Sequence, residues 1–113
     1  MIARNTLLTA PPFAVEQALK RLGSDLRTAR LRRNLTIAVV AEKIGTGRRA
    51  VMDAEKGKES TGAGVYTALL WAYGLLFQLA DVADPTHDRE GQALAVGEGR
   101  SRARNTGDLD DNF

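Results

Sequence analysis

The stretch TIAVVAEKIGTGRRAVMDAEKG, residues 36–57, decides the fold of this chain, because its pattern predicts two short helices joined by a tight turn. Thr36 carries the side-chain oxygen that a helix N-cap requires. Gly45 is placed to end the first helix, since glycine enters the left-handed conformation without steric cost. Between them, three positions recur at helical spacing and predict one buried face: Val40, Ala41 and Ile44.

The second helix of this stretch is expected to begin near Gly47. Val51 and Ala54 lie three residues apart, which places both on the inward face. The outward face then carries Arg48, Arg49 and Met52. This arrangement is typical of a helix-turn-helix, and the outward face is the one that a DNA duplex would meet.

Composition limits the kinds of protein this chain can be. At 113 residues it is long enough for one small domain with tails, and 43% of its residues are apolar. The sequence has no cysteine, which excludes disulfides, zinc–thiolate sites and thiol nucleophiles. It has a single histidine, no glycine-rich phosphate loop and no paired carboxylates. We therefore expect neither an enzyme nor a metal or cofactor site.

The start of the sequence bears on the location of the protein. The first twelve residues, MIARNTLLTAPP, hold one arginine and a very short apolar run. Neither a signal peptide nor a membrane span has this composition. We therefore expect a cytoplasmic protein.

Positive charge is concentrated around the two predicted helices. From Lys20 to Lys58 the sequence holds eleven Lys and Arg against four Asp and Glu, whereas the rest holds five against ten. Such a bias is expected of a surface that binds phosphates. The alternative is a set of solvated helix faces without a nucleic-acid partner.

The remaining segments also predict helices. Five apolar positions between Phe13 and about Arg33 step by four and three, as in an amphipathic helix: Val15, Leu19, Leu22, Leu26 and Ala29. Gly23 interrupts this pattern, and we expect one continuous helix rather than a fresh start at Ser24. Further helices are expected over residues 65–73, 75–84 and about 88–96.

The expected organisation is therefore all-α, with about five or six helices. Residues 1–12 form an N-terminal arm, and residues 13–97 form the helix-turn-helix domain with its C-terminal helices. Residues 98–113 are almost free of apolar side chains, so we expect a mobile tail. This tail contains several arginines, so two alternatives stay open: it remains solvated, or it becomes ordered against a toxin or DNA.

From Leu26 through Leu75 the sequence resembles the Cro and phage-repressor-like helix-turn-helix domains, often called the Xre family. The matching positions are Leu35-Thr36, Val40-Ala41, Ile44-Gly45, Val51, Glu55, Gly57 and Ala72 to Leu75. The resemblance implies a lambda-repressor-like helix-turn-helix domain that binds double-stranded DNA.

The flanking segments are similar to one branch of that family, the HipB-type antitoxins of HipA-like kinase toxins. This similarity lies in LGSDLRTARLRRNLT before the motif and in LADVADPTHDREG after it. It implies a type II antitoxin that represses its own operon and binds a HipA-like kinase toxin. Two alternatives stay open: an Xre-type repressor with no toxin partner, and a protein-interaction module that has lost DNA binding.

The resemblance also implies the residues that contact DNA. In this family the recognition helix enters the major groove by its N-terminal end, so the base-facing positions are Gly47, Arg48, Arg49 and Met52. An arginine can donate two parallel hydrogen bonds to guanine. The alternative is that both arginines contact only phosphates. The implied phosphate contacts are Thr36, Thr46, Lys56 and Lys58, with the backbone N–H groups of Thr46 and Gly47.

Two further features follow from the family pattern. The family pairs the glutamate equivalent to Glu55 with an arginine of the preceding long helix, which implies an Arg30–Glu55 ion pair. The family also binds palindromic operators as homodimers. The candidate dimer interface is Leu75, Leu76, Phe77, Leu79 and Leu94, with Leu19 and Leu22 as the competing surface. The alternative is that these side chains simply fill the core.

Overall fold

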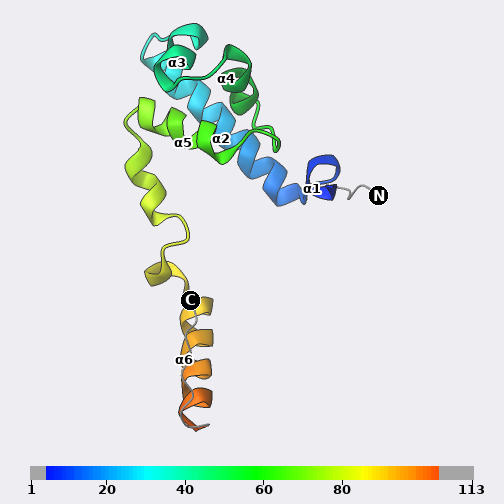
Figure 1. Ribbon diagram of the computed structural model, residues 1–113, viewed down its shortest axis with the longest axis vertical. Helices are drawn as coiled ribbons and strands as arrows, with labels where there is room; N and C mark the ends of the chain where they lie inside the picture. The colour runs from blue at the N-terminus through cyan, green and yellow to red at the C-terminus, as the bar shows by residue number, and fades with distance from the viewer. Residues whose placement is uncertain (1–4, 105–113) are drawn as a thin grey trace. The chain divides into compact units, whose positions relative to one another are not determined.

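The computed structural model describes residues 5–104, apart from the side chains of Ser101, Ala103 and Arg104 (Figure 1). This range contains six α-helices, two short 3₁₀ helices and no strand, which confirms the all-α class. The helices are α1 (Thr6–Thr9), α2 (Phe13–Arg32), α3 (Ile37–Ile44), α4 (Arg48–Glu55), α5 (Ala63–Ala72), η1 (Leu76–Asp81), η2 (Pro85–His87) and α6 (Arg89–Arg104).

The chain divides into two compact units, whereas the sequence predicts one domain over residues 13–97. The first unit is Met1–Phe77 and the second is Gln78–Phe113. The boundary falls where the apolar side chains stop being buried, because every buried hydrophobic residue in the described part of the chain lies at or before Tyr73.

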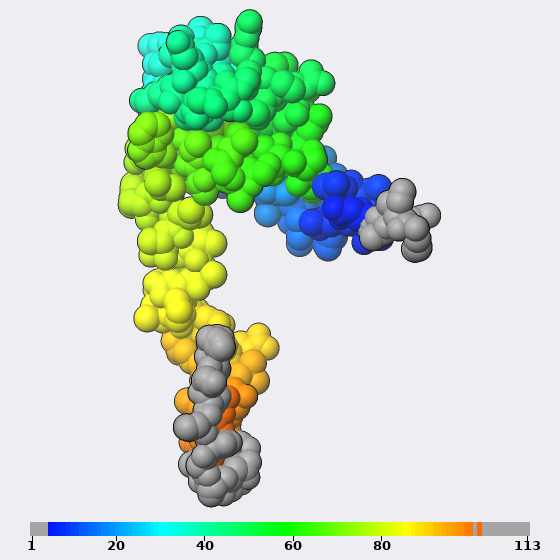
Figure 2. Space-filling model, in the orientation of Figure 1, coloured from blue at the N-terminus to red at the C-terminus, as the bar shows by residue number. Residues whose placement is uncertain are grey.

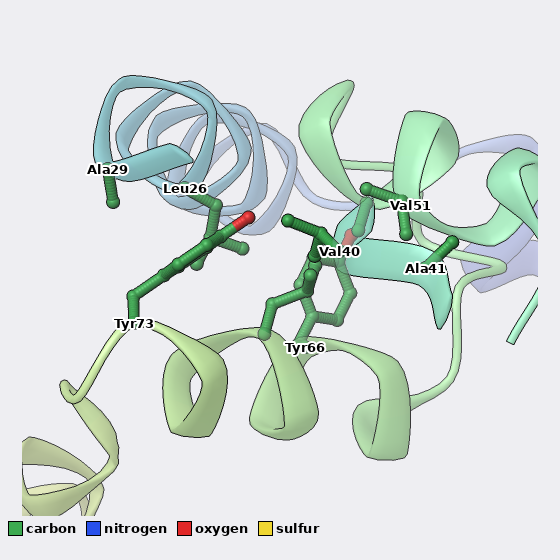
Figure 3. Close-up of a cluster of buried hydrophobic side chains, with 9 residues drawn as sticks. Leu26, Ala29, Val40, Ala41, Val51, Tyr66 and Tyr73 are labelled. Carbon is green, nitrogen blue, oxygen red and sulfur yellow. The ribbon is translucent and has the colours of Figure 1, made fainter. Parts of the chain in front are cut away.

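The core of the first unit is built from α2, α3, α4 and α5 (Figure 3). The four largest of the fully buried side chains come one from each of these helices: Leu26, Val40, Val51 and Leu69. Leu19, Leu22 and Leu75 pack against this cluster from its edge. The start of α2, together with α1, extends beyond the packed body of this unit (Figure 2).

Helix α2 is continuous through Gly23, as expected from the sequence. The reason for the glycine is packing rather than flexibility. A Cβ at Gly23 would lie 2.6 Å from the carbonyl oxygen of Ala54, and one at Gly57 would collide with the carbonyl of Leu19. The two glycines therefore let the end of α4 and the following residues approach the backbone of α2 directly.

Helices α3 and α4 are joined by a tight turn at residues 45–47. Thr36 caps α3, because its Oγ1 accepts a hydrogen bond of 3.1 Å from the N–H of Val39. Gly45 ends α3 with a left-handed φ of 79°, and the N–H of Thr46 donates back to the carbonyl of Ala41 at 2.9 Å. The local prediction for this stretch is confirmed.

The predicted helix over residues 75–84 is wrong. Gly74 takes a left-handed φ of 74°, and the chain then forms η1 and, after a break, η2. The apolar residues of η1 find no core: Leu76, Phe77 and Leu79 are all exposed. Without burial, nothing favours continuing the α-helical hydrogen bonds through this segment.

The predicted end of the last helix near Val96 is wrong, because α6 continues to Arg104. The first part of the predicted tail is therefore helical. Asp88 starts α6 by accepting a hydrogen bond of 2.9 Å from the N–H of Gly91. An ion pair of 3.4 Å between Arg102 and Glu98, one turn apart, supports its second half. Only residues 105–113 of the predicted mobile tail lie outside the described residues. The predicted arm contains α1, and its residues 1–4 also lie outside them.

Candidate nucleic-acid interface

Helix α4 presents one polar face to solvent. Val51 and Ala54 are fully buried, so the helix can expose only the opposite side. The exposed residues there are Arg48, Arg49, Met52 and Lys56, which we call the α4 face. Gly47 precedes them as the N-cap and is also exposed. Because glycine has no side chain, only its backbone is available for contacts. Each residue predicted to face bases is thus accessible.

Arg48 borders a groove between three helices. The groove has a volume of about 640 Å³ and is open to solvent. It is lined by Arg30, Leu31, Asn34, Leu35, Thr36, Ile37, Ala38, Arg48 and Met52. Its walls are therefore the end of α2, the start of α3 and the outward side of α4.

A smaller groove of about 260 Å³ shares Arg30, Ile37 and Met52 with the first and adds Lys56, Glu55 and Arg27. Sequence reasoning missed Arg27, which the structure places on this groove. A signal was available, because Arg27 precedes Arg30 by three residues on α2 and so lies on the same side of that helix. Once Arg30 is paired with Glu55 of α4, Arg27 is expected near the end of α4.

The cations of this region differ in what they already contact. Within the described residues, Arg27, Arg48 and Lys56 have no ion-pair partner. Arg33 instead donates hydrogen bonds to the carbonyls of Ala29 and Tyr73, at 2.8 and 2.9 Å. The positive charge of residues 20–58 is therefore partly structural, and three of the cations without an ion-pair partner lie on or beside α4: Arg27, Arg48 and Lys56.

Arg49 and Lys58 converge on one carboxylate. The Nε of Arg49 lies 3.7 Å from Oδ1 of Asp53, and the Nζ of Lys58 lies 3.3 Å from the same oxygen. Arg48 and Arg49 thus differ in their surroundings, since the former borders the larger groove and the latter is ion-paired. About 100° of helical rotation separates neighbouring side chains, which accounts for this difference.

The Arg30–Glu55 ion pair is present and is buried. Nε and Nη2 of Arg30 donate to the two carboxylate oxygens of Glu55 at 2.7 and 3.1 Å. Hydrogen bonding to Glu55 raises the pKa of Arg30 and outweighs the opposing effect of burial. Nη1 also donates to the carbonyl of Leu35 at 3.0 Å. One guanidinium therefore joins α2, the residue before the α3 cap, and α4.

The predicted phosphate contacts are only partly available. The side-chain oxygen of Thr36 is exposed but already accepts the capping hydrogen bond. The N–H of Thr46, a predicted phosphate donor, already donates to the carbonyl of Ala41 within the turn. Lys56 is exposed and unpaired among the described residues, whereas Lys58 is held by Asp53.

The predicted dimer residues do not fill the core, with one exception. Leu75 is half-buried and packs against the core of the first unit. Phe77 is 72% exposed, and Leu76, Leu79 and Leu94 are exposed as well. The competing residues Leu19 and Leu22 pack against the core.

Comparison with known proteins gives no assignment: no family model, no curated protein and no solved structure matches this chain. Among the helices in residues 5–104, none combines the length and the apolar character needed to cross a bilayer.

Proposed function

We propose that this chain is a dimeric, sequence-specific DNA-binding repressor of the lambda-repressor-like helix-turn-helix class. In this proposal α3 and α4 are the two motif helices, and α4 is the recognition helix. One observation carries it: the α4 face is exposed and basic, and it is bordered by Arg27, which has no carboxylate partner within the described residues.

The proposed mode of binding follows from the position of these cations. Arg48 and Arg49 occupy the first turn of α4, the end that enters the major groove in this class. Their guanidinium groups can donate to O6 and N7 of guanine, which is worth about 1–3 kcal/mol of discrimination for each well-formed contact. Arg27 and Lys56, which line the same small groove, would then contact phosphates near the end of α4, which adds affinity without sequence preference.

We further propose that the protein is a cytoplasmic, HipB-type antitoxin that autoregulates its operon and binds a HipA-like kinase toxin. Support for this part comes from the resemblance of the sequence on both sides of residues 36–57. Isolation of the protein from its native cells together with a kinase encoded by the adjacent reading frame is the expected result. Isolation without any kinase would favour an Xre-type repressor that has no toxin partner.

A second candidate is a protein-interaction module without DNA binding. It is favoured by the apolar side chains that the structure leaves in solvent. Trp71 of α5 is 56% exposed, and the Nζ of Lys43 of α3 lies 5.8 Å from its ring centroid. Tryptophan is enriched at protein interfaces and among the residues that contribute most to binding.

A salt titration separates the two candidates. Duplexes that the purified protein retains from a random pool supply the DNA, and their affinity is measured as salt rises from about 50 to 200 mM. A repressor with several phosphate contacts should lose orders of magnitude in affinity over this range through counterion release. Enrichment of no sequence, with no binding at the lowest salt, would contradict the proposed function and support the interaction module.

A further inference from the structure

We infer that Asp53 is a positioning residue that raises the sequence selectivity of the α4 face by withholding Arg49 and Lys58 from phosphates. This inference rests on the proposed function, since it concerns how the same face distinguishes a specific duplex from a random one. It assigns a role to a carboxylate that otherwise opposes DNA binding.

Asp53 lies close to the charged groups of both cations. Asp53 lies one turn after Arg49 on α4, which brings its Oδ1 to 3.7 Å from Nε of Arg49. Lys58 comes from the loop after α4, and its Nζ lies 3.3 Å from the same Oδ1. The side chain of Asp53 is 25% exposed, against 80% for Arg49, so the carboxylate is much less accessible to solvent than the guanidinium.

The position of Lys58 is set by the backbone as well as by charge. Its N–H donates to the carbonyl of Asp53 at 3.2 Å. Tyr66 holds the same residue from the other side, because its hydroxyl donates to the carbonyl of Lys58 at 2.8 Å. The backbone of Lys58 is therefore hydrogen-bonded to both α4 and α5. Its side chain and that of Arg49 approach the same oxygen of Asp53.

The consequence for random DNA is a penalty. Binding to a random duplex depends almost entirely on cations that neutralise phosphates. Asp53 competes with a phosphate for Arg49 and Lys58, because its carboxylate already neutralises part of their charge and would lie near the negatively charged duplex. Like charges brought together at an interface disfavour the complex. Arg49 and Lys58 therefore contribute less to the binding of random duplexes than unpaired cations do.

A base contact does not carry the same penalty. Asp53 engages Arg49 through Nε, which leaves both terminal Nη groups of the guanidinium. Those two groups can donate in parallel to O6 and N7 of one guanine. Arg49 can therefore contact a guanine while Asp53 still holds it, and the ion pair limits the directions in which the guanidinium points. Selectivity increases because the carboxylate weakens the phosphate contact, which depends on net charge, more than the base contact, which depends on hydrogen-bond geometry.

The test compares Asp53→Asn with Asp25→Asn, a matched control that removes the carboxylate of an exposed ion pair on α2, 3.4 Å from Arg21. Affinities are measured for the duplex selected with the wild-type protein and for a random duplex of equal length, at several salt concentrations. For Asp53→Asn we expect several-fold tighter binding of the random duplex. The dependence of log affinity on log salt should steepen by about one for each cation released. The control should leave both quantities unchanged.

A purely structural role for Asp53 predicts a different outcome. The variant would then lose unfolding free energy, and its salt dependence on random DNA would equal that of the wild type. That result, with selective binding by the wild type intact, would overturn the inference alone. If the wild type selects no duplex, the proposed function and this inference are both overturned. Adding Arg49→Ala to Asp53→Asn should remove part of the gain on random DNA, and retention of the full gain would also contradict the role assigned to Arg49.

Discussion

Arg30 of α2 and Glu55 of α4 are joined by two hydrogen bonds, of 2.7 and 3.1 Å, across a separation of 25 residues in the chain. Their side chains are 9% and 6% exposed, so the pair is almost fully withdrawn from water. Because α4 carries the proposed base contacts, this pair also fixes the helix that would enter the groove relative to the long helix of the domain.

Removing one partner of this pair should be strongly destabilising. Glu55→Ala leaves the Arg30 guanidinium buried without a carboxylate, which costs about 3–5 kcal/mol for a buried pair. Urea unfolding followed by circular dichroism measures the change. The control is Asp25→Ala, whose exposed pair with Arg21 lies on α2 alone and should cost no more than about 1 kcal/mol. Equal losses in the two variants would show that the buried pair has no special role.

Gly23→Ala tests the close approach of α2 and α4. The added methyl group would meet the carbonyl oxygens of Ala54 and Glu55 at 2.6 and 2.7 Å, closer than atoms in contact can come. Alanine favours a helix interior, yet overpacking should dominate and lower the unfolding free energy by about 1–3 kcal/mol. The matched control is Gly64→Ala on α5, where a Cβ meets nothing within 4 Å. Stabilisation of the protein by Gly23→Ala would contradict the packing described above.

The buried phenol of Tyr73 predicts a loss of stability at alkaline pH. Burial raises the pKa of Tyr73 to about 12 from its ordinary value of 10.0. Since the folded pKa is the higher one, this contribution is complete below pH 10 and is lost as pH rises from 10 to 12. Tyr73→Phe should therefore show a smaller fall in unfolding free energy across that interval.

Tyr66→Phe provides the comparison for this variant. The Tyr66 hydroxyl donates to the carbonyl of Lys58, whereas that of Tyr73 has no hydrogen-bond partner among the described residues. At neutral pH, Tyr66→Phe should cost about 1 kcal/mol and Tyr73→Phe should cost little. An unchanged alkaline profile for Tyr73→Phe would contradict the assignment of that loss to Tyr73.

Phe77→Ser tests the proposed dimer. Phe77 is 72% exposed in the single chain, and Phe13 at the start of α2 is 74% exposed and provides a matched control. If the surface after α5 forms the interface, Phe77→Ser should shift the protein toward monomers in sedimentation velocity runs at several concentrations, because a buried aromatic anchor is lost. Phe13→Ser should not. The reverse pattern would place the interface at the N-terminal end of α2.

The features predicted correctly from the sequence are those whose cause is local. Thr36 and Gly45 were identified because an N-cap oxygen and a left-handed glycine act within a few residues of their own position. The continuity of α2 followed from apolar spacing. The packing role of Gly23 was missed, since it depends on the carbonyl oxygens of residues some thirty positions further along the chain.

The errors after residue 74 have a different cause. The apolar stripe of residues 75–84 predicts an amphipathic helix, but a stripe stabilises a helix only where another surface covers it. Leu79 and Val82 are exposed, so that support is missing within the chain. The lack of apolar residues after Val96 similarly predicted an early end to α6, although the helix continues to Arg104. The spacing of Arg49 and Asp53 would have predicted their ion pair, but not the arrival of Lys58 from the loop.

The most direct measurement is the affinity of Arg48→Ala/Arg49→Ala for the duplex selected with the wild-type protein. Lys20→Ala/Arg21→Ala is the control, because it removes the same charge from α2, where both residues form exposed ion pairs. At equal salt, we expect the α4 variant to lose the preference for the selected duplex over a random one, whereas the control keeps that preference. If the α4 variant discriminates between the two duplexes as well as the wild type does, α4 is not the helix that reads DNA.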